Sequence, residues 1–238
     1  MDDPRVPSQW TLPTAPSDAM ERVTGFLRAV YGWMCVGLGL TALVAFQVAN
    51  TPAIVGRLVS NQLLYVGLIL AELGLVFYLS GRVTRLTAET ATALFVLYAA
   101  LNGVTLSLVV LAYTGQSVVD TFVVTAGMFG AMALFGSATK RSLAGVGQFM
   151  YMGLVGLVLA SLVGLFWHND ALQFLISGVG VLVFTGLAAW DAQRLKQMAL
   201  AVPDGQTRSL AIVGALSLYL DFINLFLSLL RFVGNRQE

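Results

Sequence analysis

The sequence predicts an all-α integral membrane protein with seven transmembrane helices. Hydrophobic residues make up 58% of the 238 residues and charged residues only 11%, whereas soluble domains carry about 25% charged residues. Long apolar stretches alternate with short polar breaks, and a spanning helix needs about 20 apolar residues. Because no break is long enough to hold another folded unit, we expect one helical bundle.

Seven segments meet the length requirement for a spanning helix. The expected spans are 27–49, 58–80, 91–113, 119–139, 144–167, 171–192 and 210–232. Since the connections are short, neighbouring spans should run antiparallel. Residues 1–20 are polar and hold four of the six prolines, so we expect a flexible N-terminal tail with no cleaved signal peptide. The single seven-helix domain should then cover 21–236.

The distribution of Lys and Arg predicts the orientation, because cytoplasmic loops carry the excess of these residues. With the N-terminus placed inside, the outer segments hold three of the 13 basic residues, Arg57, Arg231 and Arg236. The inner segments hold the other ten: Arg5, Arg22, Arg28, Arg82, Arg85, Lys140, Arg141, Arg194, Lys196 and Arg208. We therefore expect a cytoplasmic N-terminus and, after seven spans, a C-terminus outside.

Several function classes are disfavoured by the composition. A net charge of +1 offers no basic surface to neutralise nucleic-acid phosphates. One cysteine, Cys35, excludes an internal disulfide, and one histidine, His168, argues against a zinc site. No Ser-His-Asp set, phosphate loop or cofactor fingerprint is present. An intramembrane aspartyl protease would need a Gly-x-Gly-Asp type of motif, but Asp221 stands in LYLDFIN. We expect neither an enzyme nor a bound cofactor.

The seventh span carries a polar stripe inside an otherwise apolar helix. Gly214, Ser217, Asp221, Asn224, Ser228 and Arg231 follow one another at spacings of three or four residues, which places them on one helix face. A charge at the bilayer centre costs at least about 2.5–3.5 kcal/mol, so such a residue normally faces the bundle interior and has a function. We predict a functional role for Asp221. For Ser217 and Ser228 a hydrogen-bonding seam is an equal alternative.

A second aspartate, Asp191, lies at the end of the sixth span in LAAWDAQRLK. It could be a solvated helix end. No helix breaker follows before Pro203, however, so the helix could project beyond the membrane core and let Asp191 face Asp221. Two carboxylates in contact at low dielectric share a proton, and such a pair senses pH. It also supplies hard oxygen ligands that suit calcium.

Glu72 is the third acid within an expected span. It lies ten residues before Arg82, about 15 Å along a helix and well inside the core. We predict that it lines an ion pathway or contributes to its gate. Tyr98, Asn102 and Thr105 form a weaker polar face on the third span, which we interpret as packing.

Three segments together resemble one known family. ALSLYLDFINLFLSLLRFVGNR (215–236) closely resembles the terminal motif of the Bax inhibitor family, also called transmembrane Bax inhibitor motif proteins. TGLAAWDAQRLK and TFVVTAGMFGAMALFGSATKRSL (121–143) resemble its sixth and fourth spans. The resemblance covers residues 21–236 and is closest to the bacterial YccA-like branch. It implies six helices around a central seventh, and a location in the bacterial inner membrane.

The resemblance also implies a function and roles for particular residues. It implies a pH-sensitive calcium leak in which Asp191 and Asp221 are the paired proton sensor, and it aligns Glu72 with a family glutamate. An arginine at the end of the second helix would latch the pair in the closed state. The expected position falls at Val83, so Arg82 and Arg85 are the candidates.

The chain departs from the family pattern around Asp191. Trp190 and Ala192 replace the usual Tyr and Thr, which should change the hydrogen bonding of Asp191 but not its charge.

Two functional hypotheses remain open from the sequence. The first is the pH-gated leak, with the lipid bilayer, calcium and protons as partners. The second is a non-conducting regulator of a membrane-bound ATP-dependent protease, or a stress-protection factor, because the resemblance implies such roles as well. In that case residues 1–20 would be the contact segment.

Overall fold

The structure is a computed structural model that describes residues 16–82, 86–167, 169–201 and 207–237, and in these ranges the chain is all α. The described helices are α1 (Pro16–Ala49), α2 (Pro52–Ser60), α3 (Gln62–Gly81), α4 (Ala88–Ala112), α5 (Gly115–Ala138), α6 (Ala144–Phe166), α7 (Asp170–Ala201) and α8 (Thr207–Val233). Seven of them, all but α2, are long and apolar enough to cross a membrane. The predicted all-α membrane fold with seven spans is confirmed.

Several helix boundaries differ from the predicted spans, and those of the second and sixth spans are informative. The short helix α2 was not expected, and it moves the start of the second span from residue 58 to Gln62. Pro52 starts α2, and Asn61 ends it and caps α3 by accepting a hydrogen bond from the Leu64 backbone N–H at 3.1 Å. The expected extension of the sixth span is confirmed, since α7 continues past residue 192 to Ala201.

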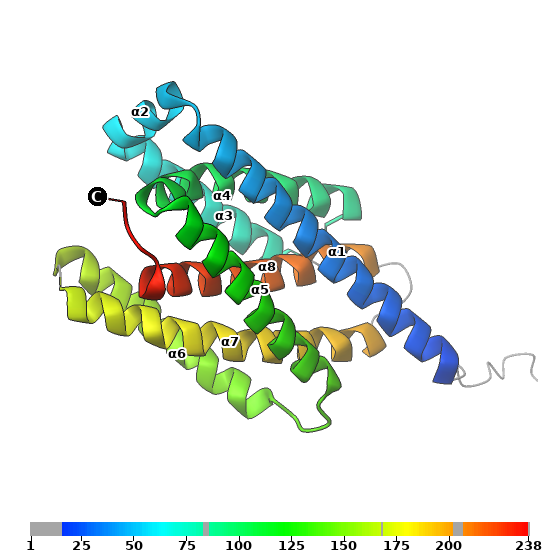
Figure 1. Cartoon of the computed structure of the whole chain (residues 1–238). Coiled ribbons are helices and arrows are strands. Elements are labelled where there is room, and N and C mark those ends of the chain that lie inside the picture. Colours follow the sequence, from blue (N-terminus) through cyan, green and yellow to red (C-terminus); the bar gives the residue numbers. More distant parts are fainter. Residues whose placement is uncertain (1–15, 83–85, 168, 202–206, 238) are drawn as a thin grey trace, which may run out of the picture.

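Helix α8 occupies the centre of the bundle (Figure 1), as predicted for the seventh span. A larger share of it is buried than of any other spanning helix in the described residues. It packs against α1, α4, α5 and α7, while α3 packs on α4 and α6 packs on α7. Leu218, Tyr219 and Leu225 of α8 are fully buried, whereas Phe149 and Met152 of α6 point outward. Such an outer apolar surface is what a lipid environment requires.

Helix α7 is held closely on two sides just before Asp191. Gly136 of α5 lies against the Ala189 backbone, and Gly147 of α6 lies against the Trp190 ring. A Cβ atom at either glycine would overlap these groups. The two glycines therefore fix the height and rotation of α7 where the aspartate follows.

The C-terminal segment is tied to the connection between α4 and α5. The Thr114 N–H donates to the Asn235 carbonyl at 3.0 Å, and the Asn235 N–H donates to Ser117 Oγ at 3.0 Å. This contact fixes the end of α8. Residues 1–15 of the predicted N-terminal tail lie outside the described residues, and α1 begins at Pro16.

Gly136→Ala should destabilise the bundle because its methyl group meets the α7 backbone, which cannot rotate away as a side chain would. Overpacking of this kind costs about 1–3 kcal/mol. We expect a lower thermal unfolding midpoint for the purified variant in detergent. Gly130→Ala on the same helix is the matched control, because a Cβ atom there meets nothing within 4 Å. Equal midpoints for the two variants would contradict a close contact between Gly136 and the α7 backbone.

Candidate functional site

Asp191 and the polar stripe of α8 meet in the interior of the bundle. Asp191 is 6% exposed and Asp221 is 7% exposed. Ser217 Oγ donates a hydrogen bond to Asp191 Oδ2, and Ser217 lies one helical turn before Asp221. The extension of α7 beyond residue 192 is what brings Asp191 to this depth. We call Asp191, Ser217 and Asp221 the aspartate site.

Asp221 has an oxygen without a protein partner. Its Oδ2 atom is buried and accepts no hydrogen bond among the described residues. The Asp191 carboxyl accepts a hydrogen bond from Ser217, one helical turn before Asp221 on the same helix. An unpartnered buried oxygen is costly and calls for an explanation. Here a proton or a cation could satisfy it.

Arg194, which the sequence analysis did not single out as a site residue, is the cation next to Asp191. Its Nη1 atom lies 3.9 Å from Asp191 Oδ1, and 54% of its side chain is exposed. Its guanidinium also lies 5.5 Å from the centre of the Trp190 ring. The tryptophan, which departs from the family pattern, thus contacts the guanidinium of Arg194. The i,i+3 spacing of Asp191 and Arg194 was the available signal in the sequence.

The predicted latch arginines lie elsewhere or cannot be placed. Arg82 is exposed at the end of α3, with its guanidinium 5.7 Å from the centre of the Tyr78 ring on the same helix. Its side chain forms no ion pair among the described residues. Arg85 lies outside the described residues.

A cavity of about 230 Å³ adjoins the aspartate site. Ser80 at the end of α3 lines it together with Asp191, Arg194, Ser217 and Leu220. Because Arg194 is more than half exposed, the cavity leads from the surface to Asp191. The cavity therefore borders Asp191 and Ser217, whereas Asp221 lies deeper and is not among the described residues that line it.

Glu72 belongs to a different polar network. Its Oε1 atom accepts a hydrogen bond from Thr105 Oγ1 at 2.9 Å, and its Oε2 atom accepts one from Asn102 Nδ2 at 3.3 Å. The Tyr219 hydroxyl donates to Asn102 Oδ1 at 3.1 Å and lies 2.6 Å from Thr41 Oγ1. Asn102 and Thr105, which we interpreted as packing, are thus the direct partners of Glu72.

This network and the aspartate site use different faces of α8. Ser217 and Tyr219 are two residues apart, which is about 200° of helix rotation. Ser217 contacts α7, whereas Tyr219 contacts α4 and α1. Helix α8 therefore contributes a side chain to each of the two polar groups, Ser217 to one and Tyr219 to the other.

The remainder of the predicted stripe bonds to its own helix. Asn224 Nδ2 donates to the Leu220 carbonyl at 2.8 Å, and Ser228 Oγ donates to the Asn224 carbonyl at 2.7 Å. Of Ser217, Asn224 and Ser228, the structure brings Ser217 to Asp191 through a hydrogen bond. Ser228 instead lies against Gly180 of α7.

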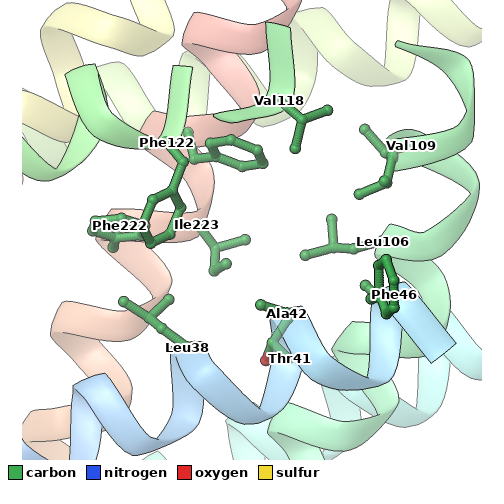
Figure 2. A pocket seen from close by; sticks show the side chains of 13 residues that line it. Leu38, Thr41, Ala42, Phe46, Leu106, Val109, Val118, Phe122, Phe222 and Ile223 are labelled. Carbon is green, nitrogen blue, oxygen red and sulfur yellow. The ribbon is translucent and has the colours of Figure 1, made fainter. Parts of the chain in front are cut away.

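A second cavity, of about 210 Å³, is apolar and lies between α1, α4, α5 and α8. Figure 2 shows Leu38, Leu106, Phe122 and Ile223 pointing into it. No titratable side chain lines it among the described residues. Its one polar lining side chain, Thr41, hydrogen-bonds to the Ala99 carbonyl at 2.8 Å. This cavity offers a cation no ligands.

The described residues contain no group of three or more His, Cys, Asp or Glu side chains that could hold a metal ion. The aspartate site offers two carboxyl groups and one hydroxyl. Calcium takes six to eight oxygen ligands, so these residues alone form an incomplete cage.

The chain is similar to known proteins over most of its length. The family model described as inhibitor of apoptosis-promoting Bax1 matches residues 23–238. The inner membrane protein YbhL of Escherichia coli strain K12 is 50% identical over 215 residues, which is 89% of this chain and 92% of YbhL. An uncharacterized protein of Borreliella burgdorferi is 44% identical over 215 residues, covering 90% and 93% of the two chains. The chain belongs to the Bax inhibitor family of membrane proteins.

Proposed function

We propose that the protein is a pH-sensitive calcium leak of the bacterial inner membrane, gated by Asp191 and Asp221. The observation that carries the proposal is the buried, unpartnered Oδ2 atom of Asp221, one helical turn from Ser217, which hydrogen-bonds to Asp191. The name of the related inner membrane protein supports the location. The excess of Lys and Arg on one side supports a cytoplasmic N-terminus and a C-terminus outside.

Protonation is the switch in this proposal. Two adjacent carboxyl groups titrate as a pair and share a proton. When the proton leaves, Asp191 keeps its bonds to Ser217 and Arg194, and the added charge changes the attraction between α7 and α8. Each unit of pKa difference between two states corresponds to about 1.4 kcal/mol. A gate balanced within a few kcal/mol would respond to that change.

The carboxyl groups would favour cations in the pathway. The cavity beside Asp191 gives an ion access to the site, and acidic side chains attract calcium over anions. Because the ligand set is incomplete, the site would contact a passing calcium ion and complete its shell with water. Calcium is the transported ion here rather than a resident cofactor.

Glu72 would couple α3 and α8 in the same gate. Its network reaches Tyr219 through Asn102, so a rotation of α8 that changes the aspartate site also moves Tyr219. Glu72 would thus keep its predicted gating role. It would act on the gate through α8 and not through contact with Asp221.

Calcium influx into liposomes containing the purified protein, followed from pH 5 to 8, tests the proposal. We expect flux that depends on pH, and we expect Asp221→Asn to flatten that dependence, because the amide cannot release the proton. Asp120→Asn is the matched control, since Asp120 is exposed on α5 and bonds to Gln116 of its own helix. The control should behave as the unmodified protein.

The absence of flux at every pH, in protein shown to be folded, would contradict the leak. The result would favour the alternative, a non-conducting regulator of a membrane-bound protease, with Asp221 as a structural polar anchor. Deletion of residues 1–20 would then be the next variant, because this tail is the expected contact segment.

The two candidate arginines give a second prediction. Arg194→Gln should shift the pH midpoint of calcium flux, because it removes the cation 3.9 Å from Asp191. Arg82→Gln should leave the midpoint unchanged, because Arg82 lies against Tyr78 instead. A shift in the Arg82 variant with none in the Arg194 variant would return the latch to the end of α3, as the family resemblance implied.

A further inference from the structure

A third cavity, of about 200 Å³, lies where the connection between α5 and α6 meets α7. Lys140, Arg141 and Lys196 line it, together with the hydroxyl side chains of Thr139 and Ser142. Among the described residues, no Asp or Glu lines it. We call this cavity the basic pocket. It lies outside the aspartate site and has no part in the proposed leak.

Hydrogen bonds fix the shape of the basic pocket. Gln193 of α7 is buried, and its Oε1 atom accepts from the Leu143 N–H at 2.8 Å while its Nε2 atom donates to the Arg141 carbonyl at 2.9 Å. Lys196 Nζ donates to the Ser137 carbonyl at 2.7 Å. The α5–α6 connection is therefore anchored on α7, and its two basic residues have a defined place.

The cations of the basic pocket remain available to an anion. Lys140 and Arg141 are exposed, and none of the three basic side chains forms an ion pair among the described residues. Lys196 donates one bond and has two further N–H groups. The adjoining helix α6 begins at Ala144, and Leu143 provides no side-chain cap. The positive end of the helix dipole thus adds to the charge.

The basic pocket also lies at the level of a membrane surface. Two spanning helices end and begin beside it, α5 at Ala138 and α6 at Ala144. Lys196 is 26 residues beyond Asp170, which is roughly 39 Å along α7 and longer than the hydrocarbon core of about 30 Å. Leu134, one turn before the end of α5 and on the membrane side of the pocket, is 72% exposed. Charged and apolar surfaces are thus adjacent, as a phospholipid requires.

From this arrangement we propose that the basic pocket binds the headgroup phosphate of an anionic phospholipid. Arg and Lys are the side chains that bind phosphate, and basic pockets between transmembrane helices bind anionic headgroups. Lys140, Arg141 and Lys196 contact the phosphate, and Thr139 and Ser142 lie beside it. The acyl chains run from the pocket toward the bilayer core along exposed apolar side chains of α5, Leu134 and Phe135.

Native mass spectrometry of the full chain, released from detergent with added lipid, tests the proposal. Phosphatidylglycerol is the anionic probe and phosphatidylcholine the zwitterionic comparison. We expect Lys140→Gln/Arg141→Gln to reduce retention of phosphatidylglycerol by roughly tenfold, since each basic residue near an anionic surface contributes a several-fold effect. Retention of phosphatidylcholine should not change.

The control variant is Arg57→Gln/Arg231→Gln, which removes the same charge from two exposed positions outside the basic pocket. It should retain phosphatidylglycerol as the unmodified protein does. Lys196→Gln is a second test, with its thermal midpoint measured because Lys196 also bonds to Ser137. The proposal would be overturned if the control lost as much phosphatidylglycerol retention as the Lys140/Arg141 variant, or if that variant lost none.

A last experiment distinguishes binding of a lipid from binding of a free anion. Inorganic phosphate, added at millimolar concentration, should neither displace phosphatidylglycerol nor raise the thermal midpoint as phosphatidylglycerol does. Stabilisation by inorganic phosphate equal to that by the lipid would show a free-phosphate site and would overturn the assignment to a lipid.

Discussion

The structure depends on the cost of placing polar groups in hydrocarbon, where each needs a partner within the protein. Helix α8 carries Ser217, Tyr219 and Asp221 in its middle, so it cannot face lipid on those sides. Its central position follows from this constraint. The neighbouring helices supply the partners, α7 through Asp191 and α4 through Asn102. Asp221 Oδ2 is the exception, with no partner among the described residues, and the proposed function is built on it.

Helix α8 is joined to its neighbours through two polar groups, so a change in one group could affect the other. The aspartate site joins α8 to α7, and the Glu72 network joins it to α4, α3 and α1. A rotation of α8 changes both sets of bonds together. The glycines that hold α7 at Ala189 and Trp190 would keep Asp191 fixed while α8 moves. A protonation event at one face would then affect helices on the other.

Much of the fold followed from hydropathy and helix signals. The seven spans were predicted because spanning helices need a minimum apolar length, and the extension of α7 was predicted because no breaker precedes Pro203. The meeting of Asp191 with the α8 stripe followed from that extension. Side-chain partners were harder to predict. Glu72 and Asn102 are 30 residues apart, and only helix packing brings them together. Arg194 was missed because a charge at a helix end resembled ordinary positive-inside charge.

In the proposed function, the carboxyl groups of Asp191 and Asp221 titrate as one unit. The most direct measurement is the protonation of the Asp221 carboxyl as a function of pH, by infrared difference spectroscopy with isotope-labelled aspartate, in the unmodified protein and in Asp191→Asn. Asp221→Asn identifies its band. We predict that the titration curve of Asp221 changes when Asp191 is replaced. An identical curve in both proteins would show that the two carboxyl groups are independent, and it would contradict the shared proton site.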